Sequence, residues 1–374
     1  MGLPYFLDPF GVGKKSIPRY GFRIDESNPS PEIERIYDSV GMVANVGTSL
    51  VDNPRNDFDG VFPFNSITKE TIAGNVMVKI PKFYISRKRY EDGGKWYFEV
   101  AICETKFDET YVPHEMFLRG NIQFSENNPE SDYNDYTYVS AYKQTHDKQA
   151  ISGYNPQVQR FRSGQRESAR SIGDGWSIMD VVTQNGLWLL YHIVFANRDS
   201  QSIMPGNTSG AVKPTGQTDG AVATCVQLGN LAMSFYGVED IYSNVAEFID
   251  GINIITTQAY ICTKIPDYAD STEQEPPNEN YRLVGYSIPM TDGYISKIGF
   301  DANNPFAMFP TEMNGSESTY YCDYATRATY YWRTLIVGGY FADDPQNGIS
   351  RWLGVNVPTF GNAQVGTRFI YRPF

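Results

Sequence analysis

Helical periodicity is confined to one part of this 374-residue chain, and that limit constrains the fold more than any other feature. From Ile178 to Ala196, apolar side chains recur at helical spacing, with Asp180 and Thr183 as candidate N-caps. A shorter helix is predicted from Arg166 to Ile172, stopped by Gly173. The rest of the chain shows strand-like runs and turn-rich loops, so the pattern predicts an α+β fold with few helices.

Two strand-like runs precede the helical part. Val76–Ile85 predicts a strand interrupted at Pro81, because proline cannot donate a hydrogen bond to a sheet. Lys95–Ile102 predicts its hairpin partner, with Glu91–Gly94 as the turn. Residues 1–72 are rich in Pro, Gly, Asn and Asp, which indicates a small, separate β-rich region.

The charge and the hydropathy pattern exclude several classes of protein. The formal net charge is −12, whereas nucleic-acid binding needs an excess of Lys and Arg, so nucleic acid is not expected as a partner. The sequence contains no apolar run of the roughly 18 residues that a membrane span requires, so we expect no membrane insertion. The N-terminal residues do not resemble a secretory signal, so we expect synthesis in the cytoplasm. If the protein works outside a cell, it is expected to leave by lysis or as part of a particle.

The sequence offers little for catalysis, cofactors or metals. The four Cys form no C-x-x-C pair, so we expect buried free thiols rather than a zinc site. Neither a phosphate-binding loop nor a serine-hydrolase elbow has the required spacing. His192 lies on the apolar helix and is expected to be a hydrogen-bonded core residue. We therefore expect no enzymatic activity, no cofactor and no metal site.

Aromatic residues gather near the C-terminal end. Between Tyr320 and Phe341, 8 of the 22 residues are aromatic, against 14% for the whole chain. These positions fit neither one amphipathic strand nor one helix, so the rings cannot all point into a single core. Exposed aromatic clusters are typical of recognition surfaces, which makes this segment a candidate for ligand binding. The alternative is that the rings fill space beneath irregular loops.

Ordered sequence motifs run along most of the chain. They are the blocks Tyr20–Gly41, Val78–Tyr84, Ala169–Trp176, Asn197–Ser202, Tyr236–Gly251, Ser318–Tyr324, Val337–Tyr340 and Gly366–Phe369. Together they resemble phage tail and prophage proteins with the C-type-lectin-like fold of the formylglycine-generating-enzyme type. Tyr236–Gly251 is similar to the G-[IV]-x-[DN]-x-x-G-N-V-W-E-[WF]-x-D-G signature of that fold. The resemblance implies a C-type-lectin-like domain over residues 73–374, with its core at 164–374, preceded by an attachment or oligomerisation region over residues 1–72.

The chain departs from that family in two places. The formylglycine-generating enzymes carry catalytic Cys after the glycine turn, whereas residues 340–352 contain no Cys, which argues against that activity. Ser243 and Ala246 stand where the signature has Gly and Trp. In the enzymes, the counterparts of Asn244 and Glu247 help to hold a structural calcium ion. Two oxygen ligands do not make a calcium site, so calcium is left open here.

The non-enzymatic members of the family include the variable proteins of diversity-generating retroelements, whose last segment lines a ligand-binding face. By that resemblance, the interleaved glycines and apolar residues of this segment act as scaffold, and its aromatic and short polar residues form an adaptable binding surface. The implied ligand-binding residues are Tyr340, Phe341, Asp343, Asp344, Asn347, Ser350, Trp352, Asn356, Thr359 and Asn362.

The resemblance implies a receptor-binding protein of a phage or prophage tail, carried on the virion. Its expected partners are a host-surface protein or glycan, other tail or particle proteins, and further copies of itself, with a trimer favoured. One alternative is a metal-dependent oxidase of the same fold. Another is a purely structural particle or surface protein, in which Tyr330–Trp332 would be buried between subunits.

Overall fold

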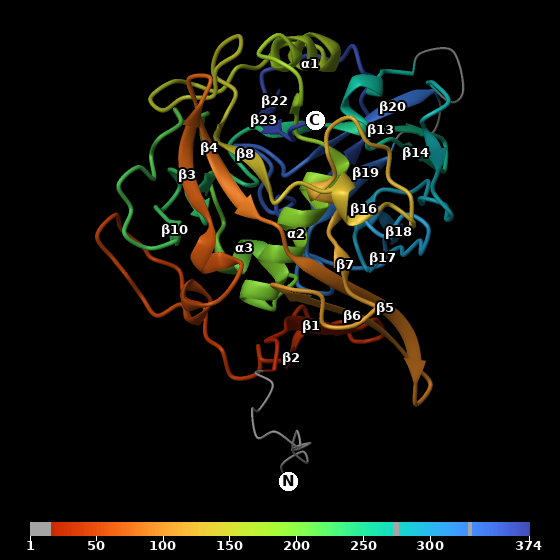
Figure 1. Ribbon diagram of the computed structural model, residues 1–374. Coiled ribbons are helices and arrows are strands. Elements are labelled where there is room, and N and C mark those ends of the chain that lie inside the picture. The colour runs from red at the N-terminus through yellow and green to blue at the C-terminus, as the bar shows by residue number, and fades with distance from the viewer. Residues whose placement is uncertain (1–15, 272–276, 328–330) are drawn as a thin grey trace.

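The computed structural model describes residues 16–271, 277–327 and 331–374, which are mostly β-sheet with few helices (Figure 1). The α-helices of these residues are α1 (Arg162–Arg170), α2 (Val181–Phe195) and α3 (Ser200–Ile203). Their 3-10 turns are η1 (Asp57–Gly60), η2 (Phe64–Ser66), η3 (Glu115–Phe117), η4 (Glu130–Asp132) and η5 (Ile265–Asp267). The predicted excess of strands over helices is confirmed.

One five-stranded sheet has the order β2-β1-β6-β5-β7. Its strands are β2 (Glu34–Tyr37), β1 (Tyr20–Asp25), β6 (Lys95–Cys103), β5 (Tyr84–Asp92) and β7 (Val112–Pro113). β1 and β6 pair antiparallel, from Tyr20 opposite Ile102 to Asp25 opposite Tyr97. The hairpin of β5 and β6 projects from the body of the molecule at the lower right of Figure 1.

A second five-stranded sheet has the order β3-β4-β8-β23-β9. Its strands are β3 (Thr68–Ile72), β4 (Asn75–Pro81), β8 (Tyr136–Lys143), β23 (Arg368–Tyr371) and β9 (Trp176–Ile178). The last strand of the chain, β23, pairs with both β8 and β9. This sheet therefore ties the C-terminal end of the chain to its first half.

The largest sheet has the order β15-β14-β13-β20-β21-β19-β16, and β22 pairs with β13. Its strands are β15 (Arg282–Leu283), β14 (Gln258–Ile261), β13 (Ala246–Ile255), β20 (Trp332–Val337), β21 (Trp352–Gly354), β19 (Tyr324–Arg327), β16 (Gly293–Tyr294) and β22 (Val365–Gly366). Two small sheets are formed by β10 (Cys225–Gln227), β11 (Met233–Phe235) and β12 (Val238–Glu239), and by β17 (Lys297–Ile298) and β18 (Pro310–Glu312).

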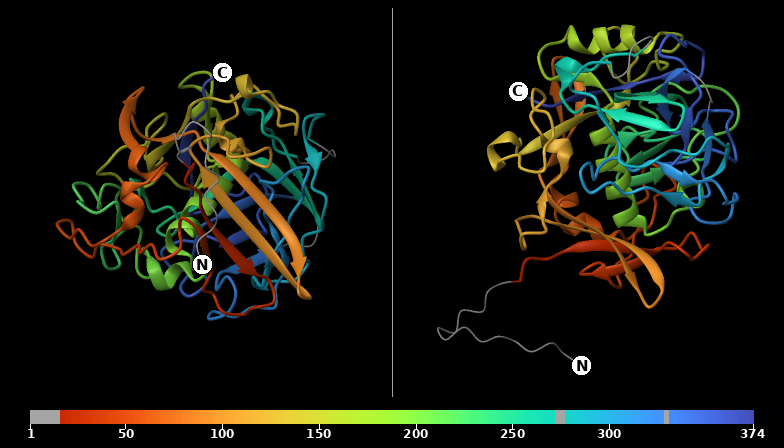
Figure 2. Two further views of the ribbon diagram at one scale, coloured as in Figure 1. Left: turned by 60° about the horizontal axis from the view of Figure 1, so that its bottom comes forward. Right: turned by 90° about the vertical axis from the view of Figure 1, so that its right-hand side faces the viewer.

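The helix α2 lies at the centre of the molecule, with strands on several sides (Figures 1 and 2). Every residue of α2 except Gln184 is buried, which suits a helix that is apolar all round. The Asp180 side chain accepts a hydrogen bond from the Thr183 amide at 2.9 Å, so Asp180 is the N-cap. The helix ends where Ala196 adopts a left-handed conformation with φ +48°. The predicted helix is confirmed over Val181–Phe195, whereas Ile178, where the prediction began, belongs to the strand Trp176–Ile178.

Other sequence predictions about the core also hold. His192 is fully buried, and its Nδ1 lies 2.7 Å from the Trp188 carbonyl oxygen. All four cysteines are buried free thiols.

None of the helices in the described part of the chain has the length and apolar character needed to cross a membrane.

The predicted boundary at residue 72 does not separate two folding units. β1 lies next to β6, and β3 lies next to β4, so backbone hydrogen bonds join the first 72 residues to later strands in two sheets. Phe22 and Phe58 belong to the same buried cluster as residues of α2. The boundary was inferred from turn-forming residues, which mark loops but carry no information about strand partners. The predicted attachment role of residues 1–72 stays a prediction.

Two element boundaries also differ from the predictions. α1 begins at Arg162, four residues before the predicted start, and Phe161 at its N-cap makes no side-chain capping bond that would mark the position. The run Val76–Ile85 is divided between β4 and β5, which lie in different sheets. Only β5 forms the predicted hairpin with β6.

Candidate functional site

The C-terminal segment between β20 and β22 begins with a turn whose backbone conformation favours glycine. Gly338 and Gly339 have φ of +84° and +64°. A Cβ at Gly339 would lie 2.3 Å from Oδ1 of Asn347 and 2.8 Å from Oδ2 of Asp343. The turn therefore packs directly on the loop that follows, as expected of a scaffold position.

A buried ion pair holds that loop. Nε of Arg351 lies 2.8 Å from Oδ2 of Asp343, and the two side chains are 3% and 6% exposed. Nη1 of Arg351 also donates to the Tyr324 carbonyl at 2.7 Å. Burial raises the pKa of Asp343, against the opposing effect of Arg351.

Four of the ten predicted ligand-binding residues are buried, so the structure does not present their side chains to a ligand, and their predicted contact with ligand has no support from their position. They are Asp343, Asn347, Ser350 and Trp352. Oγ of Ser350 accepts a hydrogen bond from the Trp188 indole at 2.9 Å, and Trp352 packs in the main core against Phe309. Short polar residues were assumed to face solvent, whereas here Asp343 and Ser350 accept hydrogen bonds from the buried donors of Arg351 and Trp188.

The other six predicted residues are partly or fully accessible: Tyr340, Phe341, Asp344, Asn356, Thr359 and Asn362. The rings of Tyr340 and Phe341 meet edge to face at 5.9 Å, and the Phe341 amide donates to the Asn244 carbonyl at 3.0 Å. Tyr340 and Phe360 pack against one buried cluster that includes Ile336 and Val365. The turn at Tyr340 and the loop 355–362 therefore lie over the same part of the core. That these residues bind a ligand stays a prediction.

The segment before α1 supports this loop, which the sequence did not reveal. The Gln159 amide donates to the Asn362 carbonyl at 2.9 Å, and the Arg162 amide donates to the Pro358 carbonyl at 3.1 Å. These bonds place the exposed side chains of Phe161 and Val357 on neighbouring segments. Residues about 200 positions apart in sequence thus share one surface.

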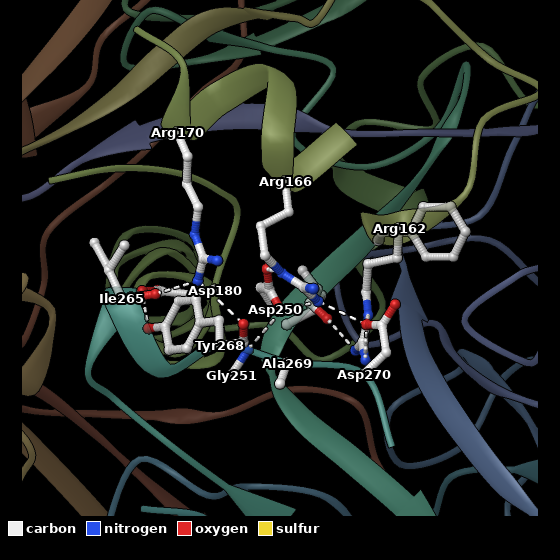
Figure 3. A network of polar contacts seen from close by, with 12 residues as sticks. Arg162, Arg166, Arg170, Asp180, Asp250, Gly251, Ile265, Tyr268, Ala269 and Asp270 are labelled. Atoms are coloured by element: carbon white, nitrogen blue, oxygen red, sulfur yellow. Dashed lines mark hydrogen bonds and ion pairs between the residues drawn. The ribbon is translucent and has the colours of Figure 1, made fainter. Parts of the chain in front are cut away.

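Three arginines of α1 anchor the helix beneath that surface (Figure 3). Arg162, Arg166 and Arg170 are four residues apart, so they lie on one helix face. Arg166 donates two hydrogen bonds, of 2.5 and 2.9 Å, to the carboxylate of Asp250 in β13. Both Arg162 and Arg166 also contact the carboxylate of Asp270. Arg170 donates to backbone carbonyls at Ile265 and Tyr268.

The same arginines determine the ionisation of Asp270. Burial alone would raise its pKa, but the charges of Arg162 and Arg166 outweigh burial and lower the pKa to about 2. Asp270 is therefore ionised at neutral pH and bridges the two guanidinium groups. The four-residue spacing of the arginines was visible in the sequence, but their partners on β13 and after η5 were not.

The residues considered for calcium do not fit that ion. Oε1 of Glu247 lies 2.8 Å from Nη2 of Arg368 and 2.5 Å from Nζ of Lys143, so both cations already neutralise this carboxylate. Oδ1 of Asn244 accepts from Asn207 at 3.1 Å and from the Lys213 amide at 2.9 Å. The oxygens that would bind calcium are therefore engaged within the protein. Among residues 16–271, 277–327 and 331–374, no group of three or more His, Cys, Asp or Glu side chains could hold a metal ion.

The aromatic segment before β20 is mixed in its exposure. Tyr321 and Trp332 are buried, whereas Tyr331 is 78% exposed. Tyr330 lies outside the described residues. The segment therefore combines core residues with at least one exposed ring, and the role of that ring in recognition stays a prediction.

Comparison with known proteins gives little to place beside this geometry. No family model matches the chain, and no curated protein matches it. Among solved structures, the chain has a weak similarity to the "Major Tropism Determinant P3c Variant", with a TM-score of 0.32 and 10% sequence identity. The match covers 96% of this chain and 73% of that chain. A likeness of this size carries no argument about function, so the function is argued from the site itself.

Proposed function

We propose that this protein is a non-enzymatic receptor- or ligand-binding protein of a phage or prophage tail, and that its C-terminal face binds a host-surface protein or glycan. One observation carries the proposal: accessible aromatic and short polar side chains sit on a loop held by a buried ion pair and a glycine turn. Pre-organised loops lose little conformational entropy on binding, and Tyr and Asn give adaptable contacts. The binding residues in this proposal are Tyr340, Phe341, Asp344, Asn356, Thr359 and Asn362.

Two features of the motif residues support a C-type-lectin-like fold of the formylglycine-generating-enzyme type. Ser243, at the position where the signature has Gly, adopts φ +72°, a conformation that glycine favours. Glu247 of the signature contacts Arg368 of the closing unit, so two motifs that are far apart in sequence meet in the core. The proposal of a phage tail protein, and of a retroelement-diversified variable protein, follows from the resemblance to that family.

The chemistry of the thiols supports a non-enzymatic role. Burial raises the pKa of Cys103 to about 11 and those of Cys262 and Cys322 to about 12. Burial also raises the pKa of Cys225. Thiolates are the reactive form of cysteine, so these thiols are poor nucleophiles and poor metal ligands at neutral pH. This proposal includes no cofactor.

The partners follow from the same role. A tail protein would present several copies of the face, and we propose a homo-oligomer, with a trimer favoured, that gains avidity from multiple weak contacts. Contacts with other particle proteins are assigned to the N-terminal strands, which Figure 2 shows at the opposite end of the molecule from α1.

The test is a triple variant that leaves the core intact. Tyr340→Ala with Asn356→Ala and Asn362→Ala removes accessible side chains, whereas Trp352 is retained because it is buried. We expect labelled protein carrying the triple change to keep its thermal unfolding temperature and to lose binding to cells of candidate bacterial hosts and to glycan arrays. The matched control is Tyr136→Ala with Asn65→Ala and Asn127→Ala, which changes exposed residues elsewhere. Equal binding by the test variant and the wild type would overturn the proposal.

A further inference from the structure

Two arginines lie at one end of the largest sheet, on its core-facing side. Arg327 ends β19 two residues after Ala325, and Arg333 is two residues before Leu335 in β20. Alternate residues of a strand point to the same face of a sheet. Ala325 and Leu335 both belong to the main buried cluster, so the two arginines project from that same face.

The guanidinium groups of these arginines have few partners. Arg327 is 5% exposed, and its Nε donates to the Pro289 carbonyl at 3.0 Å. Its Nη1 and Nη2 are buried and have no hydrogen-bond acceptor in the described parts of the chain. Arg333 donates from Nη1 to the Trp332 carbonyl at 3.2 Å, and its buried Nε has no acceptor there either. The nearby carboxylate of Asp292 accepts from the backbone amide of Arg327 at 2.6 Å.

The indole of Trp352 lies beside Arg327. Trp352 is 5% exposed, and its indole Nε1 has no acceptor among the described residues. A Cβ at Gly354 would lie 3.2 Å from Cζ3 of Trp352 and 3.7 Å from Cδ of Arg327, so both side chains flank this glycine. Cζ3 is on the edge of the indole opposite Nε1, so the indole N–H points away from the arginines. Unsatisfied buried donors are costly and rare in native proteins. The unsatisfied atoms of Arg327 and Arg333 are all donors, so a group rich in acceptors would suit them.

The electrostatics of Arg327 also favour a bound anion. Burial, together with repulsion from the charge of Arg333, lowers the pKa of Arg327 to about 10. A buried cation is normally paired, because removing its water without supplying an anion is expensive. Most other buried guanidinium groups in this protein follow that rule, as Arg166, Arg351 and Arg368 do with their carboxylates.

We propose that an oxyanion, either a phosphate or a carboxylate group, binds where β19 ends at Arg327 and β20 begins beside Arg333. Nη1 and Nη2 of Arg327 form a planar fork that matches two oxygens of such a group. Arg333 is only partly buried, so it supplies a second charge and faces the solvent from which the anion enters. This site does not depend on the proposed receptor-binding role, because none of its donors belongs to the accessible residues of the C-terminal face.

The test measures thermal unfolding of the full chain in sodium phosphate and in sodium acetate, each against sodium chloride at the same ionic strength and pH. We expect a saturable rise in Tm of the wild type with phosphate, with acetate or with both, and the effective anion identifies the ligand class. In chloride alone, we expect Arg327→Met to unfold at a higher temperature than the wild type, because it removes an unpaired buried charge. The variant should also lose the response to the oxyanion.

Two further variants make the result decisive. Arg333→Gln should weaken the response to the oxyanion by several fold in half-saturating concentration, even if Arg327→Met fails to fold. Arg55→Met, at a mostly exposed arginine, should leave the response unchanged. The proposal is overturned if the wild type shows no saturable response to either anion, or if the Arg327 and Arg333 variants both respond as the wild type does.

Discussion

Glu247 and Arg368 form an ion pair in the core, with Oε1 2.8 Å from Nη2 and side chains 4% and 0% exposed. Lys143 contacts the same carboxylate. Burial would raise the pKa of Glu247, but the two cations outweigh it and hold this pKa below its ordinary value. One carboxylate therefore compensates two buried positive charges that come from β8 and β23.

Glu247→Gln should be strongly destabilising, because it leaves Lys143 and Arg368 buried without a counter-charge. We expect the free energy of unfolding to fall by about 3–5 kcal/mol, measured by urea denaturation. The control is Glu34→Gln, which breaks the exposed pair with Arg23 and should cost about 1 kcal/mol or less. Similar losses for both variants would contradict the role given to Glu247.

Two adjacent aspartates of the C-terminal loop should separate stability from binding. Asp343→Ala leaves the buried Arg351 without a carboxylate, so we expect a loss of about 3 kcal/mol in stability. Asp344 is exposed, and Asp344→Ala should change stability by about 0.5 kcal/mol or less while weakening attachment to the target cells. Urea denaturation measures the stability of both variants, and a cell-binding assay measures their attachment to the target cells. A stable Asp343→Ala protein would show that this ion pair does not hold the loop.

Gly339→Ala should disrupt the turn that begins the C-terminal segment. Its φ of +64° penalises any side chain by about 1–2 kcal/mol, and the new Cβ would collide with Asn347, which adds about 1–3 kcal/mol. Gly93 in the β5–β6 turn has φ +58° but no atom within 4 Å of the added Cβ. Gly93→Ala should therefore show the backbone penalty alone. Equal unfolding temperatures for the two variants would mean that the packing at Gly339 is loose.

The fold was predictable where its signals are local. The α2 helix carries its own N-cap at Asp180 and an uninterrupted apolar pattern, so its bounds follow from residues close together in sequence. The turn at residues 93–94 and the pairing of β5 with β6 follow from neighbouring residues in the same way. The pairing of β1 with β6, and of β23 with β8 and β9, joins segments that are far apart in sequence. These pairings could not be predicted, because a hydropathy pattern does not specify which strands are neighbours.

The candidate site was only partly predictable for a related reason. The sequence identified the segment and its glycine turn, because a Gly-Gly pair is a local signal. It could not distinguish Asp343 from Asp344, because both positions are Asp in the sequence. Only the folded structure shows that one faces a buried arginine and the other faces solvent. The contribution of Phe161 was also hidden, because it depends on a hydrogen bond between α1 and a loop about 200 residues later.

The contribution of His192 to stability should fall as the pH is lowered from 6.5 to 4, because His192 is buried in its neutral form. Burial lowers the pKa of His192 from 6.5 to about 4, and burial also lowers the pKa of His114. The unfolded chain takes up these protons near pH 6.5, whereas the folded chain resists them until a lower pH. The stabilisation is therefore fully present above pH 6.5 and is lost as the pH falls toward 4.

His192 alone should account for about 3 kcal/mol of this loss, at about 1.36 kcal/mol for each unit of pKa. Urea denaturation of the wild type and of His192→Gln at a series of pH values between 7 and 4 measures it as the difference in unfolding free energy. His192→Gln should lower stability at pH 7, and the difference from the wild type should shrink toward pH 4, because the titrating group is gone. His146→Gln changes an exposed histidine and should leave the curve as it is in the wild type. Buried Asp240, whose pKa is raised to about 7, contributes in the opposite direction in both proteins, so the difference between them is the quantity compared. A difference that stays constant from pH 7 to pH 4 would mean that His192 can take up a proton inside the folded core.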